Sequence, residues 1–167
     1  MAIPLTGYVQ LRQVTDDDLP IFFEQQWDAD ALRMAAFAPR DRDAFLAHWT
    51  NLLADESLSV RTVLFDGLVA GNIGSWEGDG KRLVGYWIGK PFWGKGVATR
   101  ALQKFLDLIE VRPLYAHVAK HNIGSIRVLE KCGFIVCMEE TETLGMPTNE
   151  VEELVMKLSV SRNDAPQ

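Results

Sequence analysis

The chain is poor in residues that cross-link a fold or bind a metal. It contains two cysteines, Cys132 and Cys137, and three histidines among 167 residues. Two cysteines make no disulfide framework, and their spacing is not the Cys-x-x-Cys of zinc and redox sites. The sequence therefore predicts no metal, and each cysteine is interpreted as a small apolar residue.

Long apolar segments are also missing. No run approaches the ~20 apolar residues that a membrane-spanning helix needs. The first residues, Met1 to Gly7, lack the basic stretch and apolar core of a secretory leader. Both absences lead us to expect a cytoplasmic protein that is not associated with a membrane.

Positive charge is in deficit. Lys and Arg number 17 against 23 Asp and Glu, which gives a formal net charge of −6. Nucleic-acid binding needs clustered cations that neutralise phosphates, and no basic run occurs here. An acidic balance would instead steer a cationic partner such as an amine.

What the chain does contain is an ordered series of strand and helix patterns. Strands are predicted at residues 9–13, 59–65, 68–76, 83–88, 114–118, 134–143 and 151–158, and helices at 19–27, 42–54, 97–110 and 122–132. This order indicates an α+β fold, a mostly antiparallel sheet of about seven strands with helices on both faces. We expect one domain over residues 1–158 and a flexible tail at 159–167.

The most informative segment is a glycine loop between a strand and a helix. An aromatic, β-prone run ends at Gly89, and Gly94 and Gly96 then precede a helical pattern that starts at Val97. Glycine lets the backbone approach a ligand closely, and a helix N-terminus presents free N–H groups and a partial positive charge. This combination predicts a phosphate-binding loop.

The spacing of the loop is neither Gly-x-Gly-x-x-Gly nor that of a nucleotide triphosphatase. It resembles the Q/R-x-x-G-x-G/A loop of the GNAT acetyltransferase superfamily, which holds the pyrophosphate of acetyl-coenzyme A. Phe92 and Trp93 stand where that family has Gln or Arg. This substitution is similar to the Rim-type branch, named for ribosomal-protein N-terminal acetyltransferases.

A second segment supports the resemblance. The run from Asn122 to Phe134 is similar to the N-x-x-S-x-x-x-L-E-K-x-G-F element of the same branch. Asn122 is a plausible helix N-cap, and Gly133 suits a left-handed helix end. The resemblance covers roughly Leu83 to Phe134.

The resemblance implies a fold, a donor and a set of site residues. The strands that end near Ile88 and begin near Leu114 would run parallel and splay apart, with the arm of acetyl-CoA between them. Cofactor-binding residues would be Trp87, Ile88, Trp93, Gly94, Lys95, Gly96, Val97, Ala98, Thr99, Asn122 and Ser125.

The catalytic residues are predicted from what acyl transfer from a thioester to an amine requires. A backbone N–H near Ile88 would stabilise the oxyanion, and Ser125 would protonate the leaving thiolate. The position where many relatives carry a tyrosine is Leu129, and the position of a frequent acid is Leu83. Glu77, acting through water, is then the candidate base, with His117 and His121 as weaker alternatives. Ser125 and Asn122 could also serve only as helix-capping residues.

The function predicted from these residues is transfer of an acetyl group from acetyl-CoA to a primary amine, on a protein N-terminus or a small molecule. The alternative is a module that senses acyl-CoA and catalyses nothing. Acceptor specificity is expected in loops around Trp27 to Asp41 and Thr143 to Glu150. The apolar and aromatic residues of Trp27 to Phe37 and of the final strands, if exposed, are the surface at which we expect two subunits to pair into a homodimer.

Overall fold

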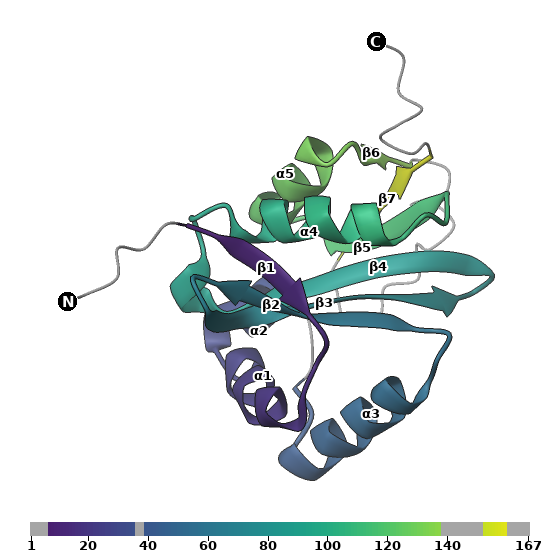
Figure 1. Cartoon of the computed structure of the whole chain (residues 1–167). Coiled ribbons are helices and arrows are strands. Elements are labelled where there is room, and N and C mark those ends of the chain that lie inside the picture. Colours follow the sequence, from purple (N-terminus) through teal and green to yellow (C-terminus); the bar gives the residue numbers. More distant parts are fainter. Residues whose placement is uncertain (1–6, 36–38, 138–151, 160–167) are drawn as a thin grey trace.

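The computed structural model describes residues 7–35, 39–137 and 152–159. Helices and strands follow one another along these residues in the order drawn in Figure 1. The elements are β1 (Val9–Arg12), the 3-10 turn η1 (Asp16–Asp18), α1 (Leu19–Gln26), α2 (Ala29–Ala35), α3 (Arg42–Ala54), β2 (Ser59–Phe65), β3 (Leu68–Gly78), β4 (Lys81–Ile88), the 3-10 turn η2 (Lys90–Phe92), α4 (Val97–Leu108), β5 (Leu114–Ala119), α5 (Ile123–Lys131), β6 (Ile135–Val136) and β7 (Glu153–Leu158).

All strands belong to one seven-stranded sheet with the order β1-β2-β3-β4-β5-β7-β6. Every neighbouring pair is antiparallel except β4 and β5, which run parallel. The mixed, mostly antiparallel α+β fold predicted from the sequence is therefore confirmed.

The parallel pair is joined only at its beginning. Its register consists of Arg82 opposite Leu114 and Leu83 opposite Tyr115. Beyond Leu83 no register pair connects the two strands in the described residues, although β4 continues to Ile88 and β5 to Ala119. The strands thus splay apart, as the family resemblance implied.

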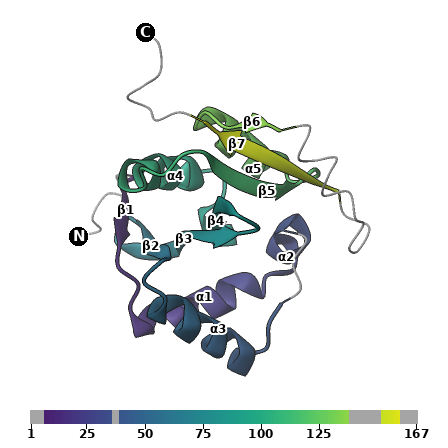
Figure 2. The same ribbon diagram turned by 90° about the vertical axis from the view of Figure 1, so that its right-hand side faces the viewer.

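Helices cover both faces of the sheet (Figures 1 and 2). On one face α4 and α5 pack on the larger apolar core, to which Phe105, Leu129 and Phe134 contribute. On the other face α1 and α3 meet through Phe22 and Trp49, whose ring centroids are 5.0 Å apart. This second cluster is smaller and rests on β2 and β3.

Local sequence signals set the turns and helix ends. Asp66 and Gly67 both have positive φ, 49° and 83°, the geometry of a two-residue hairpin loop. Asn122 caps α5 by accepting the N–H of Ser125, and Gly133 follows that helix with φ 95°. These three predictions from the sequence are confirmed.

The prediction of a loop over Trp27 to Asp41 is wrong for part of that range. Residues Ala29–Ala35 form helix α2, with Asp28 Oδ1 accepting the N–H of Ala31 at 3.0 Å. The segment is too short to show helical periodicity, and its helix depends on this cap and on packing against β5 and α1. The other predicted acceptor loop, Thr143 to Glu150, lies outside the described residues, as does the predicted tail beyond Ser159.

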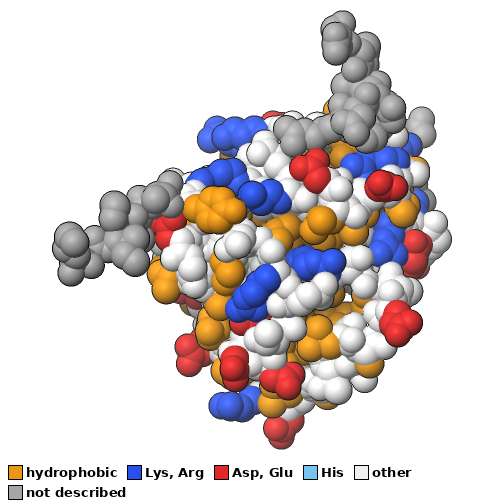
Figure 3. Space-filling model, viewed as in Figure 1, with side chains coloured by type: hydrophobic (Ala, Val, Ile, Leu, Met, Phe, Trp, Pro, Cys, Tyr) orange, Lys and Arg blue, Asp and Glu red, His pale blue; other side chains and the backbone are white. Residues whose placement is uncertain are grey.

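Charge is distributed unevenly over the surface. Figure 3 shows Lys and Arg side chains gathered over α4 and α5, whereas acidic side chains are more frequent over α1 and α3. Positive side chains therefore gather over α4, the helix that follows the glycine loop, although the chain as a whole is negative. Among the helices that the structure describes, none is long and apolar enough to cross a membrane.

Candidate active site

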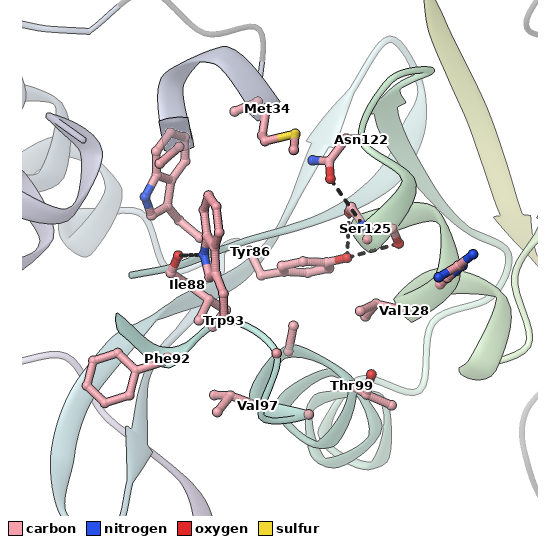
Figure 4. Close-up of a pocket in the computed structure, with 18 of the residues that line it drawn as sticks. Met34, Tyr86, Ile88, Phe92, Trp93, Val97, Thr99, Asn122, Ser125 and Val128 are labelled. Atoms are coloured by element: carbon pink, nitrogen blue, oxygen red, sulfur yellow. Dashed lines mark hydrogen bonds between the residues drawn. The ribbon is translucent and has the colours of Figure 1, made fainter. Parts of the chain in front are cut away.

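A cavity of about 470 Å³ lies beside the splayed ends of β4 and β5. Its walls come from α2, the end of β4, the loop of Gly94 and Gly96, the first turn of α4, and α5 (Figure 4). The lining residues are Ala31, Met34, Ala35, Tyr86, Trp87, Ile88, Phe92, Trp93, Gly94, Gly96, Val97, Ala98, Thr99, Asn122, Gly124, Ser125, Arg127, Val128 and Lys131. Except for Lys95, every predicted cofactor-binding residue is among them.

The glycine loop is built for close approach of a ligand to the backbone. Gly94 and Gly96 have φ angles of +74° and +73°, which L side chains rarely adopt, and Gly96 is the N-cap of α4. The N–H groups of the first turn of α4 therefore open toward the cavity that Val97, Ala98 and Thr99 line. Lys95 instead places its Nζ 6.0 Å from the ring centre of Phe65 and does not line the cavity.

Trp93 fixes the end of β4. Its indole Nε1–H donates to the carbonyl oxygen of Ile88 at 2.7 Å (Figure 4). The N–H of Gly89 donates to Ala70 of β3, and hydrogen-bonding directions alternate along a strand. The N–H of Ile88 therefore points away from β3, toward the splayed side, where an oxyanion donor is needed.

The same alternation gives Trp87 a different place. Its backbone groups face β3, opposite Asn72, and its indole Nε1–H donates to the carbonyl of Gln25 at 3.2 Å. Trp87 thus lines the cavity with its side chain. Backbone pairing with a cofactor arm, expected from the sequence at both positions, is geometrically open to Ile88 and closed to Trp87.

Three polar groups meet across the cavity. Tyr86 reaches from β4 to α5, where its hydroxyl lies 2.7 Å from Ser125 Oγ and 3.4 Å from the Ser125 carbonyl oxygen. Asn122 Oδ1 accepts the Ser125 N–H at 3.2 Å. Burial raises the pKa of the Tyr86 hydroxyl to about 12, although the hydrogen bond with Ser125 opposes that shift. The tyrosine is therefore protonated at neutral pH.

A smaller cavity of about 120 Å³ lies between β4 and β5 themselves. It shares Ala35, Tyr86, Asn122 and Ser125 with the larger one. The Tyr86–Ser125 pair thus borders both spaces. Of the predicted base candidates, only His117 lines this smaller cavity, with Nδ1 3.7 Å from Glu153 Oε2.

Helix α2 covers the site from the side opposite α4. It contributes Met34 and two alanines to the cavity wall, and Figure 4 shows Met34 facing the cleft from above. Asp30 pairs with Lys90 beside the glycine loop, while the Arg33 carbonyl oxygen lies 2.7 Å from His121 Nε2. The cover is therefore attached to both walls, and His121 has a structural contact.

Glu77 is not brought to the site. It lies on the exposed end of β3, opposite Arg82, and its Oε1 is 3.6 Å from an Arg82 nitrogen. Arg82 and Ile88 are six positions apart on β4, about 20 Å at strand rise. Glu77 borders neither cavity.

Sequence reasoning missed the hydroxyl of Tyr86, helix α2 and two cations. Tyr86 shares a strand face with Val84 and Ile88, a period of two that the sequence shows. Arg127 and Lys131 are four residues apart on α5, a spacing that would have placed them on one side of the helix. Among the residues described, no three His, Cys, Asp or Glu side chains are grouped as a metal site.

Comparison with known proteins agrees with this geometry. The family model described as "Acetyltransferase (GNAT) domain" matches residues 9–135. This chain belongs to the GNAT acetyltransferase family. Acetyl-CoA is the acetyl donor of that family, which confirms the cofactor that the sequence resemblance implied.

Curated relatives are similar over shorter stretches. "Putative ribosomal N-acetyltransferase YdaF" of Bacillus subtilis is 31% identical over 101 residues, 56% of this chain and 55% of the relative. "Probable N-acetyltransferase YjcK" of the same organism is 38% identical over 55 residues, 30% of each chain. The chain thus matches about half or less of the length of these relatives.

Solved structures share the fold. A spermidine N-acetyltransferase from Vibrio cholerae, in complex with CoA and spermine, superposes with a TM-score of 0.77 at 18% identity, over 90% of this chain and 95% of that one. The aminoglycoside acetyltransferase AAC(6')-Ib in complex with coenzyme A gives 0.71 at 22% identity, over 91% and 95%.

Proposed function

We propose that this protein is an acetyl-CoA-dependent N-acetyltransferase that transfers the acetyl group to a primary amine by direct attack. The acceptor is a protein N-terminus or a small amine. The observation that carries the proposal is one continuous cavity that joins the amides of the glycine loop to the Tyr86–Ser125 pair.

The two ends of the cavity suit the two ends of the donor. Backbone N–H groups of the loop and of the first turn of α4 would bind the pyrophosphate. The arm would lie along β4, where the parallel pairing with β5 has ended and the Ile88 N–H is directed to the splayed side. The thioester would then lie at the junction of both cavities, beside Ser125.

The chemical step needs no group beyond those in the cavity. The neutral amine forms a bond to the acetyl carbon, and the Ile88 N–H donates to the oxyanion that develops. The carbon–sulfur bond breaks, and its electron pair stays on the sulfur. The sulfur then accepts a proton from Ser125 Oγ. The proton lost by the amine nitrogen passes to solvent, from which Ser125 is reprotonated.

The acceptor amine has to lose its proton without strong help from an enzyme base. Glu77 lies far from the reacting atoms, and His117 is the only one of the proposed bases that borders a cavity. An α-amino group has a pKa of about 8, so a useful fraction is neutral near pH 7 without a base. This favours a protein N-terminus or a small amine of similar pKa over a lysine side chain.

The part of the acceptor next to the amine would meet helix α2. This wall is apolar, formed by Ala31, Met34 and Ala35. Spermine and aminoglycoside acceptors carry several ammonium groups, and among the described residues no Asp or Glu lines either cavity. The described wall therefore fits an acceptor in which the group next to the reacting amine is uncharged.

The experiment is a panel of acceptors with release of free CoA thiol as the readout. The panel holds peptides with free and blocked N-termini, polyamines, amino acids and aminoglycosides, and mass spectrometry identifies the product. An enzyme turns over at least one unblocked amine. Stoichiometric binding of acetyl-CoA without turnover of any amine would instead favour a sensor of acyl-CoA.

A further inference from the structure

The two hydroxyl groups that meet at the junction of the cavities come from different elements of the fold. Tyr86 comes from strand β4 and Ser125 from the first turn of α5, and both residues are half-buried and line both cavities. Leu129, at the position where many relatives carry a tyrosine on this helix, is 1% exposed within the apolar core. The tyrosine hydroxyl of this site is thus supplied by β4.

Either hydroxyl can donate in the hydrogen bond between Tyr86 and Ser125. The raised pKa keeps the proton on the Tyr86 oxygen throughout the range in which an amine becomes neutral. Both oxygens of Ser125 lie near the Tyr86 hydroxyl, so this proton has acceptors at 2.7 and 3.4 Å. When Tyr86 donates to Ser125 Oγ, the hydrogen of Ser125 is left for a third group in the cavity.

We infer that Tyr86 is a positioning residue that holds the Ser125 hydroxyl with its hydrogen directed at the leaving sulfur. Asn122 holds the same residue from the other side through the Ser125 N–H. Since this role presupposes acetyl transfer, it rests on the proposed function. It adds the residue that makes Ser125 an oriented donor rather than a freely rotating one.

The test is a double-mutant cycle with Tyr86→Phe and Ser125→Ala. Tyr86→Phe keeps the ring and removes the hydroxyl, so we expect kcat to fall about tenfold or more while the Kd of acetyl-CoA is unchanged. If Tyr86 acts through Ser125, Tyr86→Phe has no further effect in the Ser125→Ala background. Tyr115→Phe, which removes the hydroxyl of a buried tyrosine outside both cavities, is the matched control with unchanged kcat.

Three results would overturn the inference, and they differ in meaning. An equal fall of kcat in both backgrounds shows that Tyr86 acts independently of Ser125, and the proposed function then stands. No turnover of any amine by the wild-type protein removes the proposed function, and the role of Tyr86 with it. A change of Kd instead of kcat would make Tyr86 a binding residue and overturn positioning.

A separate observation concerns the cations of the large cavity. Arg127 and Lys131 line it from α5, both exposed at its rim, and neither forms an ion pair in the described part of the chain. Cys132 Sγ lies 3.7 Å from the Thr99 carbonyl oxygen, which places this end of α5 against the first turn of α4. The two cations therefore border the cavity near the loop that would bind the pyrophosphate.

The cations of the loop itself are directed elsewhere. Lys95 lies over the ring of Phe65, and Arg100 bonds to the carbonyl oxygens of Gly7, Lys95 and Gly96. Backbone N–H groups of the loop would bind the pyrophosphate. The positive charges of Arg127 and Lys131 are then available for a second anionic group. At the exposed rim, that group belongs to the end of the cofactor remote from the thioester.

We propose that Arg127 and Lys131 bind the 3′-phosphate of the cofactor and make the protein select CoA over dephospho-CoA. The measurement is calorimetry with these two ligands on the wild type and on Arg127→Gln/Lys131→Gln. We expect a preference for CoA of about tenfold or more in the wild type, since an ion pair with a phosphate dianion is lost in dephospho-CoA. The preference should disappear in the variant, with affinity for dephospho-CoA unchanged.

Lys104→Gln is the control, because Lys104 is a cation of α4 that lies 5.4 Å from the ring centre of Tyr8 and outside the cavity. Equal losses of affinity for both ligands in the double variant would assign the cations to the pyrophosphate and overturn the proposal. Unchanged affinities for both ligands would remove the pair from the cofactor site.

Discussion

Two hydrogen-bonded polar side chains lie on opposite faces of the sheet and differ in how their partners are arranged. Asp18, 2% exposed, accepts hydrogen bonds from two Arg12 nitrogens, the Thr62 hydroxyl and the Thr15 N–H at 2.7 to 2.9 Å. Ser125 has Tyr86 at its hydroxyl and both cavities beside it. The carboxylate is satisfied within the protein, whereas the hydroxyl retains room for a ligand.

The difference separates stability from function. A buried carboxylate with all its acceptor positions engaged fixes the entry of α1 onto the sheet, and removing a partner leaves a desolvated group without compensation. A hydroxyl that faces a cavity contributes little to folding but can donate to a reacting atom. The two sites should therefore respond in opposite ways to substitution.

The largest effect is expected at Ser125. Ser125→Ala removes the proposed proton donor, so kcat should fall by about 10²–10⁴-fold while the affinity for acetyl-CoA changes little. Steady-state kinetics and calorimetry measure the two quantities. Parallel losses in affinity and kcat/KM would make Ser125 a binding residue, and no change in either would reduce it to a residue of the helix start.

The matching substitution on the other face is Asp18→Asn. It removes the charge opposite Arg12 and two acceptor sites, so the free energy of unfolding at pH 7 should fall by about 1–3 kcal/mol. The kcat of the folded variant should equal that of the wild type, because Asp18 lines neither cavity. Urea unfolding provides the stability. A loss of kcat without a loss of stability would break the comparison between the two faces.

Lowering the pH tests the same comparison, because it protonates Asp18 without any substitution at Ser125. Burial raises the pKa of Asp18, but bonds from Arg12, Thr15 and Thr62 outweigh it and lower the native value to about 2, from 3.8 for an unperturbed Asp. A depressed native pKa stabilises the fold above the unfolded value, and this stabilisation is lost as pH falls through about 4 to 2. The difference in stability between wild type and Asp18→Asn should shrink over that window. A constant difference would show that the charge is not its source.

A smaller loss is expected from the glycine loop. Gly96→Val places a β-branched residue at φ +73°, next to the N–H groups that would bind the pyrophosphate, and should weaken acetyl-CoA binding about tenfold or more, which is 1.4 kcal/mol. Gly80→Val is the control, since Gly80 has φ +75° in the β3–β4 hairpin, with no atom within 4 Å of an added Cβ. Equal affinities in both variants would remove the loop amides from the site.

The parts of this structure that sequence reasoning predicted are those with local signals. The hairpin at Asp66, the cap at Asn122 and the glycines of the loop each depend on the φ angle or the hydrogen bond of a single residue. Helix α2 has no such periodicity, because seven residues span two turns and its contacts are tertiary. The sequence therefore predicts a loop at these residues.

The partners of the site residues were not predictable for a related reason. Tyr86 and Ser125 are 39 residues apart, and their contact depends on how α5 lies across β4. Glu77 is close to the site residues of β4 along the chain, but the direction of β3 places it opposite Arg82, at the far end of β4. A pattern along the chain predicts on which face of a strand or helix a residue lies. The residue that it contacts on another element depends on the whole fold.

The smallest effect expected is a change of rate with pH, no more than tenfold per unit. If the amine loses its proton without an enzyme base, kcat/KM rises along one ionisation that belongs to the acceptor, at roughly 8 for an α-amino group. Tyr86, with a pKa of about 12, adds no falling limb between pH 6 and about 9. The measurement is the pH profile for acceptors of different amine pKa with the enzyme unchanged. A midpoint that moves with the acceptor confirms substrate ionisation. A midpoint that stays fixed requires an enzyme base, and His117→Gln should then abolish it, because His117 borders the smaller cavity while Glu77 borders neither.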